Sequence, residues 1–329
     1  MIRFGLIGTN WITDRLIEAA KETEGFSLGA VYSRTQERGA EFAAKHGIPH
    51  VFADLAAMAS SGTIDAVYLA SPNAYHAEQA ELCMRHGLHV LCEKPLASNA
   101  AEVRRMTEAA RANGVLLMEA LKSTFMPNFR AIQAHLPKIG KIRRFVGNYG
   151  QYSSRYDAYR AGTVLNAFNP EYSNGALMDL GIYCLYPAIA LFGRPEAVQA
   201  NGYLLASGVD GEGSLLLRYP DMEGVIMYSK ISNSSLHSEI QGEEGSILIE
   251  QISQPDKVVL RYRDGREEDI SVPQSAHTMR YEVQAFIDLI RAGKRESEVN
   301  SYALSLAVME VMDEARRQMG LVYPADAAL

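Results

Sequence analysis

Short apolar runs alternate with amphipathic stretches over the first 120 residues of this 329-residue chain. The runs have the length of buried strands and lie at residues 2–8, 26–32, 64–69, 88–92 and 115–118. The stretches between them place apolar residues at helical spacing, and two of them end at Gly87 and Gly114. This alternation predicts βαβ units, and hence a parallel sheet with helices on both faces.

The pattern changes after about residue 120. Helices with an apolar face are predicted near residues 125–136, 175–192, 281–292 and 302–319. Between residues 196 and 272, short strands follow one another across turn sequences, which predicts an antiparallel or mixed sheet. We therefore predict an α/β protein with two domains. A doubly wound Rossmann domain covers residues 1–120, and an α+β domain with an open, mostly antiparallel sheet covers residues 121–329.

Composition and charge narrow the classes of function. The net charge is −7 and the chain has no block of basic residues, which argues against a nucleic-acid-binding surface. We find no apolar run of the roughly 20 residues that a membrane span needs. The first residues lead directly into a strand, so we expect a cytoplasmic protein. The three cysteines and the histidines show no ligand spacing, so we predict no metal site.

A tight turn and a helix follow the first strand, as in dinucleotide-binding domains. Gly8 takes the position of the first motif glycine, while Asn10 and Thr13 replace the second and third. We expect the turn to survive at Asn10, because asparagine takes positive φ more readily than most residues. The residues predicted to bind the pyrophosphate are Gly8, Thr9, Asn10, Trp11 and Ile12. An ordinary strand–helix unit without a ligand remains the alternative.

The end of the second strand indicates which nicotinamide cofactor binds. NAD-binding domains place an acidic residue there, which accepts hydrogen bonds from the ribose 2′-hydroxyl. This chain has Ser33 and Arg34 instead, and Arg38 follows one turn later. A cation there would attract a 2′-phosphate, so we predict that NADP is preferred and that NAD is the second choice. The alternative is that Arg34 is an ordinary exposed arginine.

The strand at residues 88–92 ends at Glu93, Lys94 and Pro95. Proline cannot continue an interior strand, so the acid and the base are presented at its carboxyl end. Ligands bind at this edge of open α/β sheets. Lys94 is therefore a candidate proton donor or fixed positive charge, and a surface ion pair is the alternative.

These features resemble those of the glucose–fructose oxidoreductase, inositol dehydrogenase and related (Gfo/Idh/MocA) family, which includes the dihydrodiol dehydrogenases. The likeness covers nearly the whole chain and includes Gly8-Thr9, Ser71-Pro72-Asn73 with His76, Glu93-Lys94-Pro95, and residues 175–183. It implies a Rossmann domain joined to a larger open-sheet domain. It also implies hydride transfer between a nicotinamide and a hydroxyl or carbonyl carbon, usually of a sugar or polyol.

The resemblance assigns roles to individual residues. Lys94 would polarise the substrate oxygen, and Asp179 and Tyr183, four residues apart on a helix, would bind or protonate it. The expected cofactor contacts beyond the first turn are Ser71, Pro72, Asn73, His76 and Glu93. Lys122-Ser123 differs from the tryptophan and arginine of dihydrodiol-type relatives, which leaves the substrate open. The tyrosine-rich segment at residues 149–159 could cover a sugar ring or form a surface loop.

The sequence thus predicts an NAD(P)-dependent oxidoreductase that acts on a sugar, a polyol or a related small molecule. Two alternatives are a non-catalytic NAD(P)-binding sensor and a glycosidase that uses NAD for transient oxidation. We expect no membrane or nucleic-acid partner. Strands with apolar residues on both faces predict a homodimer or homotetramer through the open sheet.

Overall fold

The computed structural model describes residues 1–328, which form two compact units. Unit 1 comprises residues 1–121 and 275–305, and unit 2 comprises residues 122–274 and the chain from Leu306 onward. The sequence analysis placed everything after residue 120 in the second domain, but residues 275–305 belong to unit 1. The physical reason is apolar packing, because helix α9 (Arg280–Arg291) lies against α1 (Trp11–Ala20) and its Phe286 ring lies 5.9 Å from that of Phe4.

Unit 1 contains a six-stranded parallel sheet with the strand order β3-β2-β1-β4-β5-β6. Its strands are β1 (Ile2–Ile7), β2 (Phe26–Tyr32), β3 (His50–Phe52), β4 (Ala66–Leu69), β5 (His89–Glu93) and β6 (Leu117–Ala120). Every residue of β4 is buried, as expected of a parallel strand covered on both faces. The strand order reverses between β1 and β4, so their carboxyl ends form the switch point where ligands bind in such folds.

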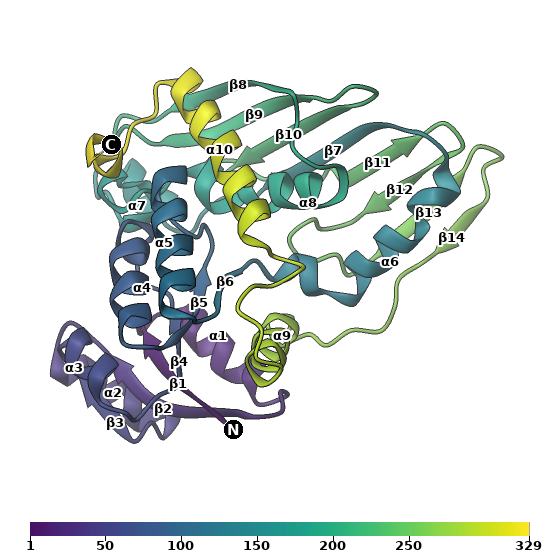
Figure 1. Ribbon diagram of the computed structural model, residues 1–329. Coiled ribbons are helices and arrows are strands. Elements are labelled where there is room, and N and C mark those ends of the chain that lie inside the picture. The colour runs from purple at the N-terminus through teal and green to yellow at the C-terminus, as the bar shows by residue number, and fades with distance from the viewer. Residues whose placement is uncertain (329) are drawn as a thin grey trace. The chain divides into compact units, whose positions relative to one another are not determined.

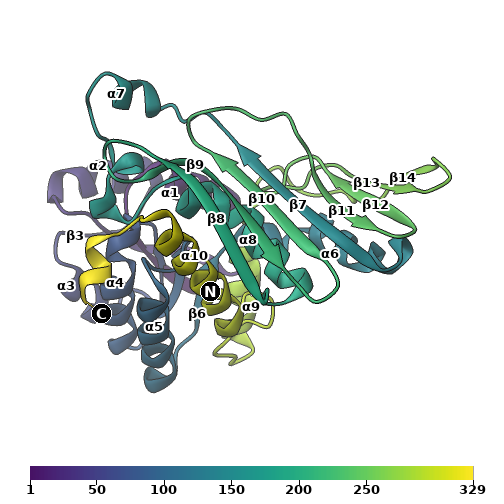
Figure 2. The ribbon, with the colours of Figure 1, turned by 90° about the horizontal axis from the view of Figure 1, so that it is seen from above.

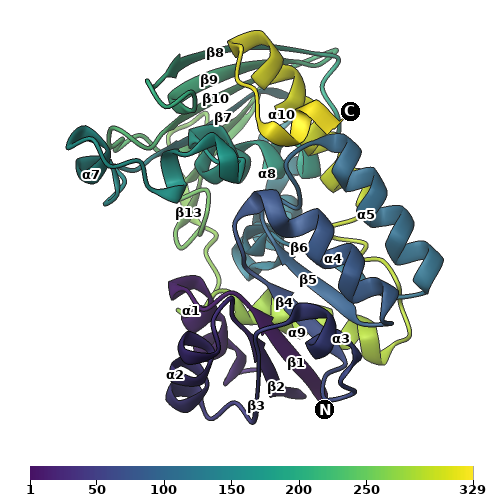
Figure 3. The same ribbon diagram turned by 90° about the vertical axis from the view of Figure 1, so that its left-hand side faces the viewer.

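Helices cover both faces of this sheet and connect its strands. They are α1 (Trp11–Ala20), α2 (Gln36–His46), α3 (Leu55–Ser60), the turn η1 (Asn73–Tyr75), α4 (His76–Arg85), α5 (Ala100–Asn113) and α9 (Arg280–Arg291). Figure 3 shows α4 and α5 side by side, and they are in contact. Asn99 caps α5 by accepting the N–H of Glu102, and Gly114 ends it with φ of +63°.

Unit 2 is built on an eight-stranded sheet with the order β14-β13-β12-β11-β7-β10-β9-β8 (Figure 1). Its strands are β7 (Ile142–Gly150), β8 (Ala197–Leu204), β9 (Asp210–Arg218), β10 (Glu223–Ser229), β11 (Ser238–Gly242), β12 (Gly245–Ile249), β13 (Val258–Tyr262) and β14 (Glu267–Asp269). All neighbours are antiparallel except β7 and β10. The predicted fold class is confirmed, although the sequence analysis did not predict the central strand β7.

Helices α6 and α8 lie on the same face of this sheet (Figure 2). The helical elements are η2 (Lys122–Phe125), α6 (Pro127–His135), η3 (Leu136–Ile139), α7 (Tyr156–Arg160), η4 (Asn166–Phe168), η5 (Pro170–Tyr172), η6 (Leu177–Gly181), α8 (Ile182–Phe192), α10 (Tyr302–Met319) and η7 (Pro324–Ala328). Helix α10 begins in unit 1 and continues in unit 2.

The stretch Pro170–Phe192 is long and apolar enough to cross a membrane, with a mean hydropathy of 1.6. The sequence analysis did not single out this stretch, which is interrupted by the acidic residues Glu171 and Asp179. Within the described residues, however, 72% of its apolar window is buried inside the protein, and α8 contacts β7 and β10. Its main part, α8, is therefore a core helix of unit 2.

Candidate functional site

The turn after β1 brings Gly8 into close contact with the main chain at the end of β4. Gly8 has φ of +109°, and a Cβ there would lie 2.6 Å from the carbonyl oxygen of Ala70. Asn10 has φ of −113°, so the expected positive φ is wrong. Its Oδ1 instead accepts hydrogen bonds from Ile12 N (3.1 Å) and Thr13 N (3.3 Å), and its Nδ2 donates to Ala70 O (2.8 Å). The close approach of Gly8 to Ala70 requires glycine, and the turn leads directly into the start of α1, an arrangement that fits the backbone cradle of a dinucleotide pyrophosphate.

Two arginines and Ser33 are the candidates for binding the 2′-phosphate of NADP. Arg38, on the first turn of α2, donates from Nε to Thr9 Oγ1 (2.9 Å) and from Nη2 to Thr9 O (3.3 Å). Arg34 is exposed, whereas Ser33 is buried. Trp11, also on the cofactor turn, is exposed. The arginines are therefore better placed than Ser33 to meet a phosphate.

The residues after β4 support the same edge of the sheet. Ser71 donates from Oγ to Gln79 Oε1 (2.7 Å), and Pro72 and Asn73 lead into α4. His76 is fully buried, with Nδ1 3.0 Å from Pro95 O and Nε2 2.9 Å from Ser71 O, and burial lowers its pKa. Both ring nitrogens thus contact the main chain, and the structure does not place His76 as a cofactor ligand. It joins the end of β4 to the turn after β5.

Glu93 and Lys94 lie at the carboxyl end of β5, where the sequence analysis expected them. Glu93 Oε1 accepts a hydrogen bond of 2.5 Å from the hydroxyl of Tyr68, a fully buried residue of the neighbouring strand β4. Its Oε2 accepts the backbone N–H of Lys94 (3.3 Å). The peptide bond between Lys94 and Pro95 is cis. Glu93 therefore fixes the main chain that carries Lys94.

Glu119, the third residue of β6, supports the same turn and was not predicted as a site residue. It is 3% exposed, and its Oε1 accepts the N–H of Leu96 (2.8 Å), two residues after Lys94. Burial raises its pKa to about 7, and the negative charge of Glu93 adds to this shift. The shift is opposed by hydrogen bonds from Ser305 and Leu96 and by the positive charge of Lys94. A glutamate within an apolar strand gives no local signal of this role, because only the pairing of β5 with β6 creates it.

Asp179 and Tyr183 lie on the helical segment formed by η6 and α8 in unit 2. The first part, η6, is a π-helical turn, a form that is rare and frequently occurs at functional sites. Asp179 lies on this turn, and the ring of Tyr183 lies edge-on to that of Tyr149 at 5.8 Å. The sequence predicted the helix but not its π-helical start.

Asp210, on β9, holds the start of this segment. Its carboxylate accepts hydrogen bonds from Ala176 N (3.0 Å) and Leu177 N (2.7 Å), and burial raises its pKa to about 6. Gly175 has φ of +147°, and a Cβ there would collide with Oδ1 of Asp210. The glycine before the helix is therefore required by the contact with Asp210, not only by a flexible turn.

Asp179 forms an ion pair with Lys230, which the sequence analysis did not single out. Lys230 Nζ lies 3.0 Å from Asp179 Oδ2 and 5.2 Å from the centroid of the Phe168 ring. Part of the tyrosine-rich segment packs on this ring, with Tyr156 at 5.5 Å and Tyr159 at 5.3 Å. The segment is therefore part of the surroundings of Asp179 rather than a detached surface loop.

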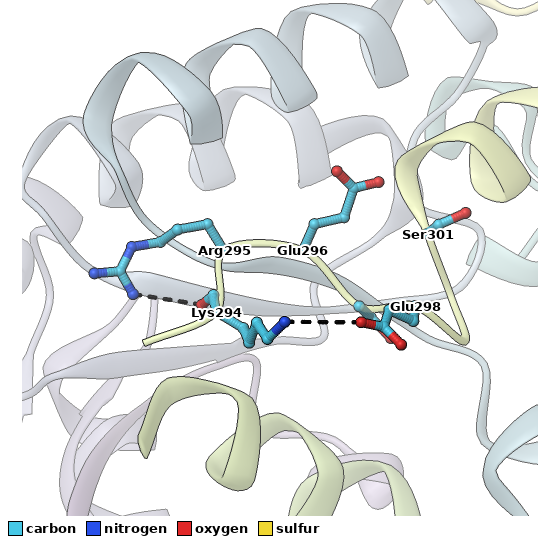
Figure 4. Close-up of a pocket in the computed structure, with 6 residues that line it drawn as sticks. Lys294, Arg295, Glu296, Glu298 and Ser301 are labelled. Atoms are coloured by element: carbon cyan, nitrogen blue, oxygen red, sulfur yellow. Dashed lines mark hydrogen bonds and ion pairs between the residues drawn. The ribbon is translucent and has the colours of Figure 1, made fainter. Parts of the chain in front are cut away.

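The pocket in Figure 4 belongs to unit 1 and has a volume of about 440 Å³. Its lining residues are Lys294, Arg295, Glu296, Ser297, Glu298 and Ser301. Tyr302 Oη donates to Arg295 O (2.7 Å) and accepts the N–H of Leu117 (3.4 Å), the first residue of β6. Arg295 therefore lies at the amino end of β6, opposite the edge where ligands bind in such sheets.

Two further predicted features concern unit 2 and metal binding. Lys122 donates to Gln254 Oε1 (3.2 Å), and Ser123 is fully buried. Among residues 1–328, no group of three or more histidine, cysteine or acidic side chains is arranged to hold a metal ion.

Comparison with known proteins identifies the family. Residues 2–121 match the "Oxidoreductase family, NAD-binding Rossmann fold", and residues 135–248 match the "GFO/IDH/MocA C-terminal domain". The chain is 60% identical over 328 residues, covering 100% of both chains, to scyllo-inositol 2-dehydrogenase (NADP(+)) IolU of Bacillus subtilis. The chain belongs to the Gfo/Idh/MocA oxidoreductase family. The predicted family and the predicted class of enzyme, an NAD(P)-dependent oxidoreductase of the sugar and polyol type, are thereby confirmed.

More distant members of the Gfo/Idh/MocA family agree. The trans-1,2-dihydrobenzene-1,2-diol dehydrogenase of Xenopus tropicalis is 31% identical over 309 residues, which cover 90% of each chain. The crystal structure of KijD10, a 3-ketoreductase from Actinomadura kijaniata in complex with NADP and TDP-benzene, superposes with a TM-score of 0.84. It is 24% identical and covers 97% of this chain and 98% of its own, which confirms the fold.

Proposed function

We propose that the protein is an NADP(H)-preferring dehydrogenase that interconverts a cyclic polyol, with scyllo-inositol as the first candidate, and the corresponding ketone. The observation that carries this proposal is the full-length identity of 60% to the Bacillus enzyme. The cradle at Gly8 and the arginines near it support the choice of cofactor. The free, buried cysteines Cys83, Cys92 and Cys184 support a cytoplasmic location.

The proposed roles follow from the chemistry of the side chains. A nicotinamide cofactor, when bound, would supply the hydride acceptor for the carbon that bears the reacting hydroxyl. Lys94 holds the oxygen of that hydroxyl with its ammonium group and stabilises the negative charge that develops as the proton leaves. Tyr183, as the phenolate, accepts this proton, and Asp179 accepts a hydrogen bond from a hydroxyl of the substrate.

The test is oxidation of a panel of inositol isomers and aldoses with NADP⁺ and with NAD⁺, followed by the absorbance of the reduced nicotinamide. We expect the fastest turnover with an inositol and NADP⁺. Cofactor binding without turnover of any substrate would favour a sensor instead. Release of nitrophenol from a chromogenic glycoside would favour an NAD-dependent glycosidase.

Replacing Arg34 by alanine is expected to remove most of the preference for NADP(H). Charge-assisted hydrogen bonds to a 2′-phosphate contribute roughly 1.5–3 kcal/mol each, so two of them suffice for about a hundredfold discrimination. Arg38→Ala should have a similar effect, since Arg38 already contacts the cofactor turn at Thr9. The measurement is the Kd of each cofactor for the wild type and both variants.

Arg85→Ala is the control, because Arg85 is an exposed arginine at the end of α4 in the same unit. It should leave both dissociation constants unchanged. Equal affinities of the wild type for NADP(H) and NAD(H) would show that the end of β2 does not select the cofactor.

We propose that the open face of the unit 2 sheet binds a second copy of the chain. Residues paired across neighbouring strands form a row of apolar side chains on this face, and Glu239 interrupts it between β7 and β12. We call this row the apolar row. It consists of Leu216, Val225, Val146, Leu248 and Val259. Leu216 is 48% exposed, and the others are partly exposed. A row of this kind across a wide sheet is typical of an interface between subunits.

Val146→Arg, in the middle of the apolar row, is expected to convert the assembly to a monomer without unfolding unit 2. An unpaired charge buried at the centre of an interface opposes association. Light scattering at micromolar concentration measures the mass. Val322→Arg is the control, because Val322 is 67% exposed and lies outside the apolar row. A monomeric wild type would contradict the proposal.

A further inference from the structure

Lys230 is a buried lysine for which the proposed chemistry has no role. It directly follows β10 and is 2% exposed. Its backbone N–H donates to Gly211 O (2.8 Å), and its carbonyl accepts the N–H of Ser153 (2.8 Å). Its ammonium lies 3.0 Å from Oδ2 of Asp179, whose side chain is 37% exposed. The ion pair therefore joins an interior cation, fixed through its main chain, to a carboxylate that solvent can reach.

The ammonium of Lys230 has its hydrogens committed within the protein. Besides Asp179, Nζ donates to Ala167 O (3.0 Å) and to Asn174 Oδ1 (3.4 Å). A lysine has three N–H donors and no acceptor, so these three oxygens account for all of them. Lys230 therefore has no hydrogen left to donate to a substrate, and its influence on a reaction must pass through Asp179.

We propose that Lys230 is the positioning residue of Asp179, which it holds ionised and in one orientation, so that Asp179 accepts a hydrogen bond from a substrate hydroxyl and does not donate a proton. This inference rests on the proposed function for the substrate being a polyol. A cation at this distance favours the charged form of a carboxylate, and burial of Lys230 limits the screening of their attraction by water.

The groups around the pair are consistent with this assignment. The titratable side chains nearby include Asp210 and Glu212 from β9, Tyr228 from β10, Tyr156 and Tyr159 from α7, Tyr183 from α8 and Tyr323 from the C-terminal segment. Asp210 is bonded to the two N–H groups at the start of the helix, and Glu212 accepts hydrogen bonds from Ser229 and Ser232. Asp179 is thus the carboxylate that contacts the ammonium directly and is also partly exposed.

The first test compares Lys230→Met with a matched control. We expect Lys230→Met to lower kcat/KM by at least about tenfold, because a mobile or protonated Asp179 binds the transition state less well. Arg316→Met removes another buried cation of unit 2, which pairs with Asp313 and Asp326 at 2.7 Å, and should leave kcat/KM within about twofold. If Lys230→Met does not fold, Lys230→Gln, which keeps a donor for Ala167 O, takes its place.

A double-mutant cycle separates positioning from general structural damage. In an Asp179→Asn background, Lys230→Met should change kcat/KM by less than about twofold, because the group through which it acts is already neutral. Losses that multiply across the two sites would overturn the proposal.

A second readout needs no substrate. The measurement is an NMR titration of protein labelled with ¹³C at the aspartate carboxyls. The signal of Asp179 is assigned as the one that is missing from Asp179→Asn. This signal should titrate at higher pH in Lys230→Met than in the wild type. If the wild type oxidises no polyol, the proposed function fails and this titration alone decides the role of Lys230. An unchanged titration would overturn it.

Discussion

Replacing Lys94 by methionine is expected to lower kcat/KM by at least about a hundredfold while the protein still folds and binds its cofactor. A loss of this size corresponds to roughly 3 kcal/mol of transition-state stabilisation, as expected when a preorganised cation is removed from a developing negative charge. The structure supports preorganisation, because Glu93 accepts the N–H of Lys94 and Glu119 accepts the N–H of Leu96. Methionine keeps an unbranched side chain of nearly the same length and removes the charge and the donors.

The measurement is steady-state turnover of the best polyol, together with the Kd of NADP(H). Lys45→Met is the control, because Lys45 is an exposed lysine of unit 1 that pairs with Asp14 on the surface. Near-normal turnover by Lys94→Met would contradict the assignment. A loss of cofactor affinity equal to the loss of turnover would instead place Lys94 in cofactor binding.

The stability of unit 1 is expected to fall as the pH rises through 7, and Glu119→Gln should abolish much of this fall. The pKa of Glu119 is raised from 4.5 to about 7 in the folded protein. The stabilisation that this shift gives the folded state is therefore complete below about pH 4.5 and is lost as the pH rises through about 7. Between these values the folded state binds more protons than the unfolded state. The shift corresponds to about 3 kcal/mol of unfolding free energy.

The free energy of unfolding in urea is measured for the wild type and for Glu119→Gln at about pH 5 and pH 8. The value for the variant is subtracted from that of the wild type at each pH, which removes the contribution of other groups such as Asp210. Glutamine keeps an oxygen acceptor for Leu96 N–H. Ser305→Ala should enlarge the pH-dependent loss, because the hydrogen bond from Ser305 lowers the pKa of Glu119. A difference between wild type and Glu119→Gln that does not vary with pH would show that Glu119 is not neutral in the folded protein at pH 5.

Local patterns in the sequence were enough to predict most of unit 1. Strands that alternate with helices fix the topology, and a strand interrupted by Glu93-Lys94-Pro95 marks the edge of the sheet that carries Lys94. The helix from 302 to 319 was predicted with the bounds that α10 has in the structure. These features depend on periodicity and on residues close together in the chain.

The features that were missed depend on contacts between distant residues. Strand β7 begins with Ile142, Arg143 and Arg144, whose charges obscure the alternation, and it is stabilised by pairing with β10 and β11. Lys230 follows an apolar strand, as surface lysines commonly do, and only the fold brings it to Asp179. Asn10 was read as a substitute for glycine, whereas its side chain replaces the motif by hydrogen bonds to Ile12 and Thr13.

The return of residues 275–305 to unit 1 has a consequence for the synthesis of the protein. A nascent chain that has emerged up to residue 121 contains all six strands of the first sheet but lacks α9, so Phe4 does not yet have Phe286 to pack against. At typical ribosomal rates, about 10–30 seconds pass before residue 275 follows. During this time the whole of β7–β14 is made. The apolar side of the β1–α1 region must remain uncovered, or be held by a chaperone, until the ribosome has nearly finished the chain.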